Sequence, residues 1–288
     1  MKKWVSILLS LVTFFVASLI HGVVSVVVTI LYMIIKGVMV YSDVSLSPGE
    51  MENQLYDIAE NIMLDKNFVG IATFLATAAT LVVGGICYYF CFVRKNKQNM
   101  KLTKIIDGKC LIQLIVLGIG VQFFISGILN IILLLNPFLA NNDVSEMISM
   151  YSIFMICSVV LLAPIAEEII YRGIVLKLCE KSMSFAVANV IQALLFGIYH
   201  MNLVQGIYAF FCGLVLGYIC KKRKSIIASI FLHMIVNISS YFMTAIENIP
   251  ISEVVLIFII LDVGGILMLG SLLTIKEPEE EQEGMFMI

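Results

Sequence analysis

The stretch WVSILLSLVTFFVASLIHGVVSVVVTILYMII (residues 4–35) decides the fold class, because it runs for 32 residues without a charged side chain. A helix needs about 20 apolar residues to cross the hydrocarbon core of a bilayer. Lys2 and Lys3 precede the run, as basic residues precede the apolar core of a signal peptide. The run is longer than such a core, however, and has no clear cleavage site. We therefore expect a retained membrane helix, tilted or kinked.

The whole chain shares this apolar character. Of its 288 residues 61% are hydrophobic and 13% are charged, the net charge is −2, and the mean hydropathy is +1.04. Soluble domains carry about 25% charged residues. The composition excludes a soluble enzyme and a disordered chain, gives no sign of a nucleic-acid partner, and indicates one membrane-embedded domain over residues 1–288 that contacts the lipid bilayer.

Seven further apolar runs follow the first one, and lipid-embedded backbone favours helices because their hydrogen bonds are internal. The sequence therefore predicts an all-α polytopic membrane protein with about eight transmembrane helices. After Trp4–Ile35, the expected spans are Val69–Val93, Cys110–Leu135, Ser149–Arg172, Met183–His200, Ile207–Cys220, Ile226–Phe242 and Val254–Ile275. The seven cysteines form no CxxC pair and resemble small apolar residues rather than disulfide or zinc ligands.

Basic residues predict the orientation. If the chain alternates from a cytoplasmic N-terminus, 15 of the 18 basic residues lie on the inner side, and the outer loops are acidic. This bias places both termini in the cytoplasm. The N-terminal Met-Lys-Lys and the Lys/Ile-rich composition fit a bacterial cell membrane.

Two segments are expected to lie at the periphery. Residues 41–68 have apolar positions at helical spacing, so they form either a helix on the outer surface or a solvated loop. The tail 277–288 begins with a run of glutamates and is expected to be an acidic cytoplasmic end.

Ionisable residues inside membrane spans indicate function, because placing them there is costly. Residues 163–173 read APIAEEIIYRG, with two adjacent glutamates in an apolar span. Glu168 and Arg172 are i,i+4 and can pair, which leaves Glu167 pointing about 100° away and free for chemistry. Pro164 can kink this helix. A structural salt bridge at a helix end is the alternative interpretation.

Two of the three histidines also end or interrupt apolar runs. His200 follows Phe196 by four residues, and His233 precedes Asn237 by four, so each pair shares one helix face. A lone buried histidine is usually structural. Several polar groups in lipid need one another, however, so a shared interior site is the economical arrangement.

The order Glu-Glu-x-x-x-Arg, Phe-x-x-x-His and His-x-x-x-Asn on successive membrane helices resembles the CPBP family of intramembrane endopeptidases. This family includes type II CAAX prenyl endopeptidases and bacterial bacteriocin-processing or Abi proteins. The resemblance covers a catalytic core at residues 149–242. It implies catalytic residues on the fourth, fifth and seventh helices and a peptide or membrane-protein substrate cut near the cytoplasmic face.

The resemblance also implies roles for the motif residues. Glu167 and His200 would activate a water, and His233 and Asn237 would donate hydrogen bonds to the oxyanion. Glu168, Arg172 and Phe196 would support them.

A metal-free glutamate mechanism is favoured, and no cofactor is expected. The alternative is a zinc site of Glu167, His200 and His233, although the H-E-x-x-H spacing of common zinc proteases is absent.

The depth of His200 creates a geometric tension. If the fifth run began at the inner surface near Met183, His200 would lie about 25 Å deep and out of reach of Glu167. Either of two arrangements would bring the two together: a shallow hairpin of the fifth and sixth runs that turns within residues 200–206, or an extension of the fourth and fifth helices into the cytoplasm near residues 173–185.

Two other functions compete with the endopeptidase. A non-catalytic immunity or scaffold protein would keep the helices without turnover. A proton-coupled transporter would use Glu167, His200, His233 and Asp262 as a relay. Asp262 lies in the last span, and an interhelical hydrogen bond is the simplest expectation for it.

Overall fold

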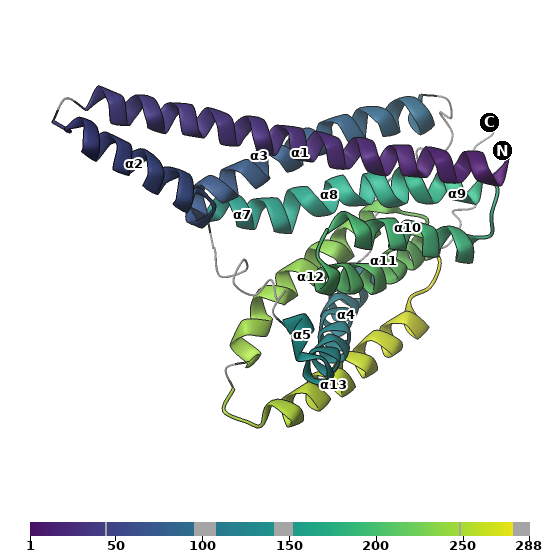
Figure 1. Cartoon of the computed structure of the whole chain (residues 1–288). Helices are drawn as coiled ribbons and strands as arrows, with labels where there is room; N and C mark the ends of the chain where they lie inside the picture. Colours follow the sequence, from purple (N-terminus) through teal and green to yellow (C-terminus); the bar gives the residue numbers. More distant parts are fainter. Residues whose placement is uncertain (44, 95–107, 141–151, 248, 279–288) are drawn as a thin grey trace.

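The computed structural model describes residues 1–43, 45–94, 108–140, 152–247 and 249–278. In these residues the backbone forms helices and turns and no strand (Figure 1). The N-terminal part consists of α1 (Lys3–Ser42), α2 (Pro48–Asn61), η1 (Ile62–Leu64), α3 (Lys66–Tyr88) and η2 (Tyr89–Val93). Next come α4 (Gly108–Leu135) and α5 (Pro137–Ala140).

One long composite helix follows, over residues 153–180. It consists of α7 (Ile153–Cys157), η3 (Ser158–Leu162), α8 (Ala163–Glu168), η4 (Ile169–Leu176) and α9 (Lys177–Glu180). The chain then forms α10 (Phe185–Tyr199), α11 (Leu203–Arg223), α12 (Ile226–Glu247) and α13 (Glu253–Thr274).

The predicted fold class, an all-α polytopic membrane protein, is confirmed. Seven of the described helices are long and apolar enough to cross a membrane. The fifth expected span, Met183–His200, is only the 15-residue helix α10, which is too short to cross alone. The described residues thus hold seven candidate spans and one shorter apolar helix, α10.

A second correction concerns the fourth expected span, Ser149–Arg172. The composite helix continues to Glu180, so Glu167 lies near its middle and not at its end. The reason is that residues 173–176 are apolar and helix-compatible, and Lys177 is the first charge after Arg172. Parts of the expected inner loop (95–107) and acidic tail (279–288) lie outside the described residues, as do residues 149–151.

The peripheral segment 41–68 contains a helix, α2, and not only a loop. Ser47 caps its N-terminus, accepting from the Glu50 backbone, while the Glu50 carboxylate accepts from the Ser47 N–H at 2.8 Å. This capping box satisfies two N-terminal donors. Helix α2 returns along α1 (Figure 1).

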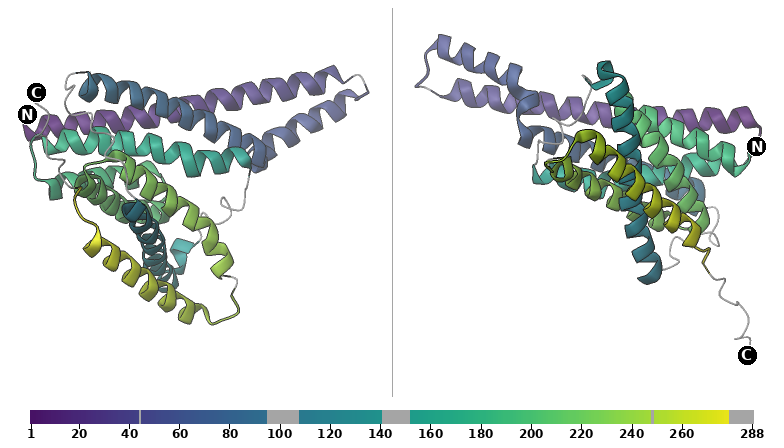
Figure 2. Two further views of the ribbon diagram at one scale, coloured as in Figure 1. Left: turned by 180° about the vertical axis from the view of Figure 1, so that it is seen from behind. Right: turned by 90° about the horizontal axis from the view of Figure 1, so that it is seen from below.

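The helices lie in two layers (Figures 1 and 2). One layer holds α1, α3 and the composite helix side by side; the other holds α4 and α10–α13. Helices α4 and α13 cross very closely, since a Cβ on Gly264 would lie 2.3 Å from the Phe124 backbone nitrogen. The glycine at position 264 thus permits this close packing, since any larger residue would have to displace the neighbouring backbone.

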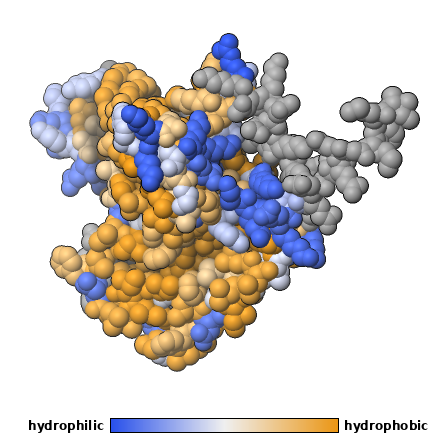
Figure 3. All heavy atoms as spheres, turned by 90° about the vertical axis from the view of Figure 1, so that its right-hand side faces the viewer, coloured by the Kyte–Doolittle hydropathy of each residue, from blue (hydrophilic) through white to orange (hydrophobic). Residues whose placement is uncertain are grey.

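Several helix ends meet at one end of the molecule. The hydroxyls of Ser6 and Ser182 are 2.7 Å apart, and Arg223 donates to the Lys276 carbonyl at 2.6 Å. The basic segments near these residues are therefore neighbours. Figure 3, which views this end, shows hydrophilic residues gathered within a largely hydrophobic surface.

Candidate active site

The composite helix changes its hydrogen-bond register around the two glutamates. The short α8 lies between the π-helical segments η3 and η4. In η3 the Ala163 N–H bonds to the Ser158 carbonyl, so the next donor in this register would be residue 164 for the Val159 carbonyl. Residue 164 is a proline and has no N–H. The Val159 carbonyl is thus left for a side chain, and Asn237 donates to it at 2.8 Å.

A buried ion pair forms the centre of the site. Arg172 Nη1 lies 2.7 Å from Glu168 Oε1, and both side chains are fully buried. Arg172 also donates to the Gly213 carbonyl at 3.1 Å. The i,i+4 pairing of Glu168 with Arg172 predicted from the sequence is confirmed.

Helix α12 supplies the other hydrogen-bond partners of Glu168. The Ser229 hydroxyl donates to Glu168 Oε2, and His233 Nδ1 lies 2.9 Å from Glu168 Oε1. Together with Arg172, these groups use both carboxylate oxygens. Sequence reasoning misses Ser229, although its position four residues before His233 places it on the same helix face.

Glu167 faces the other nitrogen of His233. His233 Nε2 lies 3.7 Å from Glu167 Oε2, and the Glu167 side chain keeps 15% of its surface accessible. Glu167 is thus the carboxylate of the pair that remains free of Arg172 and reachable.

The helices α10 and α11 form a tight antiparallel hairpin that presents His200. Residues 200–202 make the turn, and Met201 adopts a left-handed conformation with φ 52°. The hairpin needs glycines, because a Cβ on Gly197 would lie 2.6 Å from the Gly206 carbonyl oxygen. This arrangement confirms the hairpin expected within residues 200–206.

The Phe196 ring joins the two histidines and Arg172. Its centroid lies 5.0 Å from that of His200 and 5.7 Å from that of His233, both edge-on. The Arg172 guanidinium lies over the same ring at 4.7 Å. His200 Nδ1 lies 2.9 Å from the Phe196 carbonyl, so Nδ1 is the donor and Nε2 is left for another partner.

The structure brings six of the seven predicted site residues around one centre: Glu167, Glu168, Arg172, Phe196, His200 and His233. The seventh, Asn237, is one helical turn beyond His233, and one of its amide hydrogens is used by Val159.

The residues of the zinc alternative do not form a ligand set in the described part of the chain. No group of three or more His, Cys, Asp or Glu side chains is placed there to hold a metal ion.

Asp262 does not meet its expectation. It is exposed on α13, and within the described residues no hydrogen bond or ion pair to it is seen. The expected interhelical hydrogen bond is absent because α13 turns this position away from α4, whereas Gly264 faces that helix.

Comparison with known proteins gives one result. The family model described as type II CAAX prenyl endopeptidase Rce1-like matches residues 149–239. Neither the curated proteins nor the solved structures gave a match. The matched segment contains Glu167, His200, His233 and Asn237. Residues 149–239 are thus similar to the Rce1-like type II CAAX prenyl endopeptidases, the family that the three motifs resemble.

Proposed function

We propose that this protein is an intramembrane endopeptidase that hydrolyses a peptide bond of a peptide or membrane-protein substrate near the cytoplasmic face. The observation that carries the proposal is the buried centre in which His233 lies between Glu167 and Glu168, with His200 held by the hairpin against the same Phe196 ring that His233 contacts. Its position inside the Rce1-like segment supports the same conclusion.

Glu167 acts as the general base in this proposal. It is reachable, whereas Glu168 is fully occupied by Arg172, His233 and Ser229. A water between Glu167 and His200 Nε2 gives its proton to Glu167, and its oxygen forms a bond to the substrate carbonyl carbon. Glu167 then delivers the proton to the amide nitrogen as the C–N bond breaks.

His233 and Asn237 act as oxyanion donors. Glu168 fixes the His233 ring by accepting from Nδ1–H, so that the protonated ring presents Nε2–H toward the Glu167 side of the site. Asn237 keeps a second amide hydrogen besides the one donated to Val159. Losing one such donor typically lowers the rate by about 10²–10³-fold.

The oxyanion role requires a proton on His233 Nε2 in addition to the one that Nδ1 donates to Glu168. Both termini are proposed to be cytoplasmic, on the basis of the basic residues gathered at one end.

The test compares membranes of cells that express the wild-type chain or Glu167→Gln. Mass spectrometry of the membrane peptides should show a set that is cut by the wild type and persists uncut with the variant, a loss of at least about 10²-fold. Glu253→Gln, an exposed glutamate in the first turn of α13, is the control and should behave as wild type. Equal cutting with Glu167→Gln at equal expression would favour the non-catalytic scaffold instead.

A chelator separates the two mechanisms. The metal-free mechanism predicts that EDTA or 1,10-phenanthroline leaves cleavage unchanged in purified, reconstituted protein. Loss of cleavage that added zinc restores would support the zinc set of Glu167, His200 and His233.

A further inference from the structure

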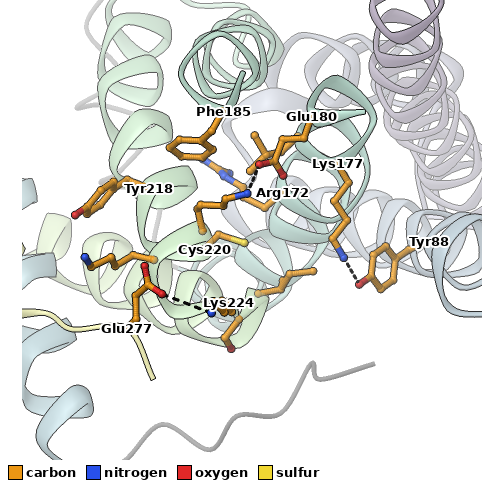
Figure 4. Close-up of a pocket in the computed structure, with 14 residues that line it drawn as sticks. Tyr88, Arg172, Lys177, Glu180, Phe185, Tyr218, Cys220, Lys224 and Glu277 are labelled. Carbon is orange, nitrogen blue, oxygen red and sulfur yellow. Dashed lines mark hydrogen bonds and ion pairs between the residues drawn. The ribbon is translucent and has the colours of Figure 1, made fainter. Parts of the chain in front are cut away.

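A pocket of about 600 Å³ opens at the basic end of the molecule, where the composite helix, the end of α11 and the start of α12 meet (Figure 4). Glu167, His200 and His233 do not line it. The pocket therefore borders the proposed catalytic centre at Arg172, the partner of Glu168, but is lined by none of the groups that act on the substrate in the proposed mechanism.

The lining combines positive charge with apolar walls. Four lysines and two glutamates line the pocket, together with apolar and aromatic side chains such as Leu176, Phe185, Tyr218 and Ile226. The lysines are Lys177, Lys221, Lys222 and Lys224. A positively charged rim above apolar walls suits an anionic group attached to an apolar stem.

The lysines differ in how far they are already engaged. Lys221 pairs with Glu180 at 2.5 Å, and Lys177 donates to the Tyr88 hydroxyl at 3.0 Å (Figure 4). Lys224 lies 3.5 Å from Glu277, with both side chains more than half exposed. Within the described residues, Lys222 has neither a hydrogen bond nor an ion pair, so its charge is available to a ligand.

The inner wall carries a second unmet donor. Arg172 lines the pocket and is fully buried, yet its Nε–H has no hydrogen-bond partner in the described structure. Buried donors are normally satisfied, so this one points to a water or an acceptor group that reaches the pocket floor.

We propose that this pocket binds the head group of an anionic phospholipid. The pocket lies at the ends of helices that are apolar enough to span a membrane, and the apolar walls would receive the start of the acyl chains. Basic pockets between membrane helices on the cytoplasmic side bind such head groups. A soluble acidic peptide would have no need of apolar walls.

The test uses the purified full chain, delipidated in neutral detergent and transferred to nanodiscs. Phosphatidylglycerol should raise the apparent melting temperature and bind in native mass spectrometry, whereas phosphatidylcholine should do neither. The double variant Lys221→Gln/Lys222→Gln should weaken the apparent affinity by about fivefold for each lysine. Lys66→Gln, an exposed lysine at the start of α3, is the matched control and should bind as wild type.

Other anions, tested in the same assay, show whether the pocket recognises a lipid head group or any anionic group. Inorganic phosphate at the same concentration should not reproduce the stabilisation, because it lacks the apolar stem. Equal effects of the two lipids, wild-type affinity of the double variant, or full stabilisation by phosphate or by a poly-glutamate peptide would each overturn the proposal. The melting temperature of the double variant in phosphatidylcholine should match wild type, which excludes misfolding as the cause.

Discussion

In soluble proteins charged side chains lie at the surface and large apolar side chains are buried. The buried centre of the composite helix reverses this distribution, and so does helix α1. In the centre, Glu168 and Arg172 are charged and have no accessible surface. Along α1, large apolar side chains such as Trp4 and Leu19 are 63% and 65% exposed. The contrast shows that α1 is stabilised by lipid, whereas the centre depends on matched partners inside the protein.

The largest expected effect comes from breaking the matched pair. Arg172→Met leaves Glu168 buried without its cation and should destabilise the protein by about 3–5 kcal/mol, measured by chemical or thermal unfolding in detergent. The double variant Glu168→Gln/Arg172→Met should recover part of this loss, because no isolated charge remains.

An exposed ion pair provides the control. Lys221→Met removes the partner of Glu180 at the protein surface and should cost less than about 1 kcal/mol. Wild-type stability of Arg172→Met would show that the buried pair does not hold the centre together.

The central pair could be predicted from the sequence because its geometry is local. Positions i and i+4 on a helix face each other wherever the helix lies. The same spacing would have revealed Ser229 beside His233, had all polar residues of α12 been compared. Helix α10 has only 15 residues, so it is too short to cross a bilayer alone.

The partner of Asn237 could not be predicted in the same way. The Val159 carbonyl is available only because η3 has π-helical register just before Pro164, and a proline in sequence does not specify that register. The exposure of Asp262 likewise depends on how α13 rotates against α4, which is set by the contact of Gly264 with Phe124.

The second prediction compares two helical glycines, one in each region. A Cβ on Gly217 would lie 1.9 Å from Asn189 Oδ1 and 2.7 Å from Gln192 Nε2, which hold α10 against α11. Gly217→Ala should therefore cost about 1–3 kcal/mol. Gly22 in α1 has nothing within 4 Å of its Cβ position. Gly22→Ala should cost nothing and can gain up to about 1 kcal/mol, because alanine favours helix.

Unfolding of both alanine variants in the same detergent provides the measurement. Equal losses would mean that α1 packs as closely as the hairpin, and the comparison between the two regions would fail. The rate of substrate cleavage should also fall in Gly217→Ala although His200 itself is unchanged, since the hairpin positions that histidine.

The smallest effect is expected where α1 has one of its few polar contacts. Asp65 caps the N-terminus of α3, and the Tyr32 hydroxyl of α1 donates to it at 2.7 Å. This hydrogen bond, with the Phe68 and Asn67 backbone N–H groups, lowers the pKa of Asp65 below its ordinary value of 3.8. Asp65→Ala should cost about 1 kcal/mol at neutral pH, the usual value of a cap.

The pH dependence of this effect follows from the lowered pKa. Because the folded state favours the ionised carboxylate, its contribution is fully present above the ordinary pKa and is lost as the pH falls through the folded value. The stability difference between wild type and Asp65→Ala should thus be constant above about pH 5 and shrink below about pH 4. Asp65→Asn keeps a capping oxygen without a titratable group, so its difference from Asp65→Ala should not vary with pH. A wild-type difference that grows on acidification would mean that Asp65 is protonated in the folded protein, and that α1 is held to α3 by apolar contacts alone.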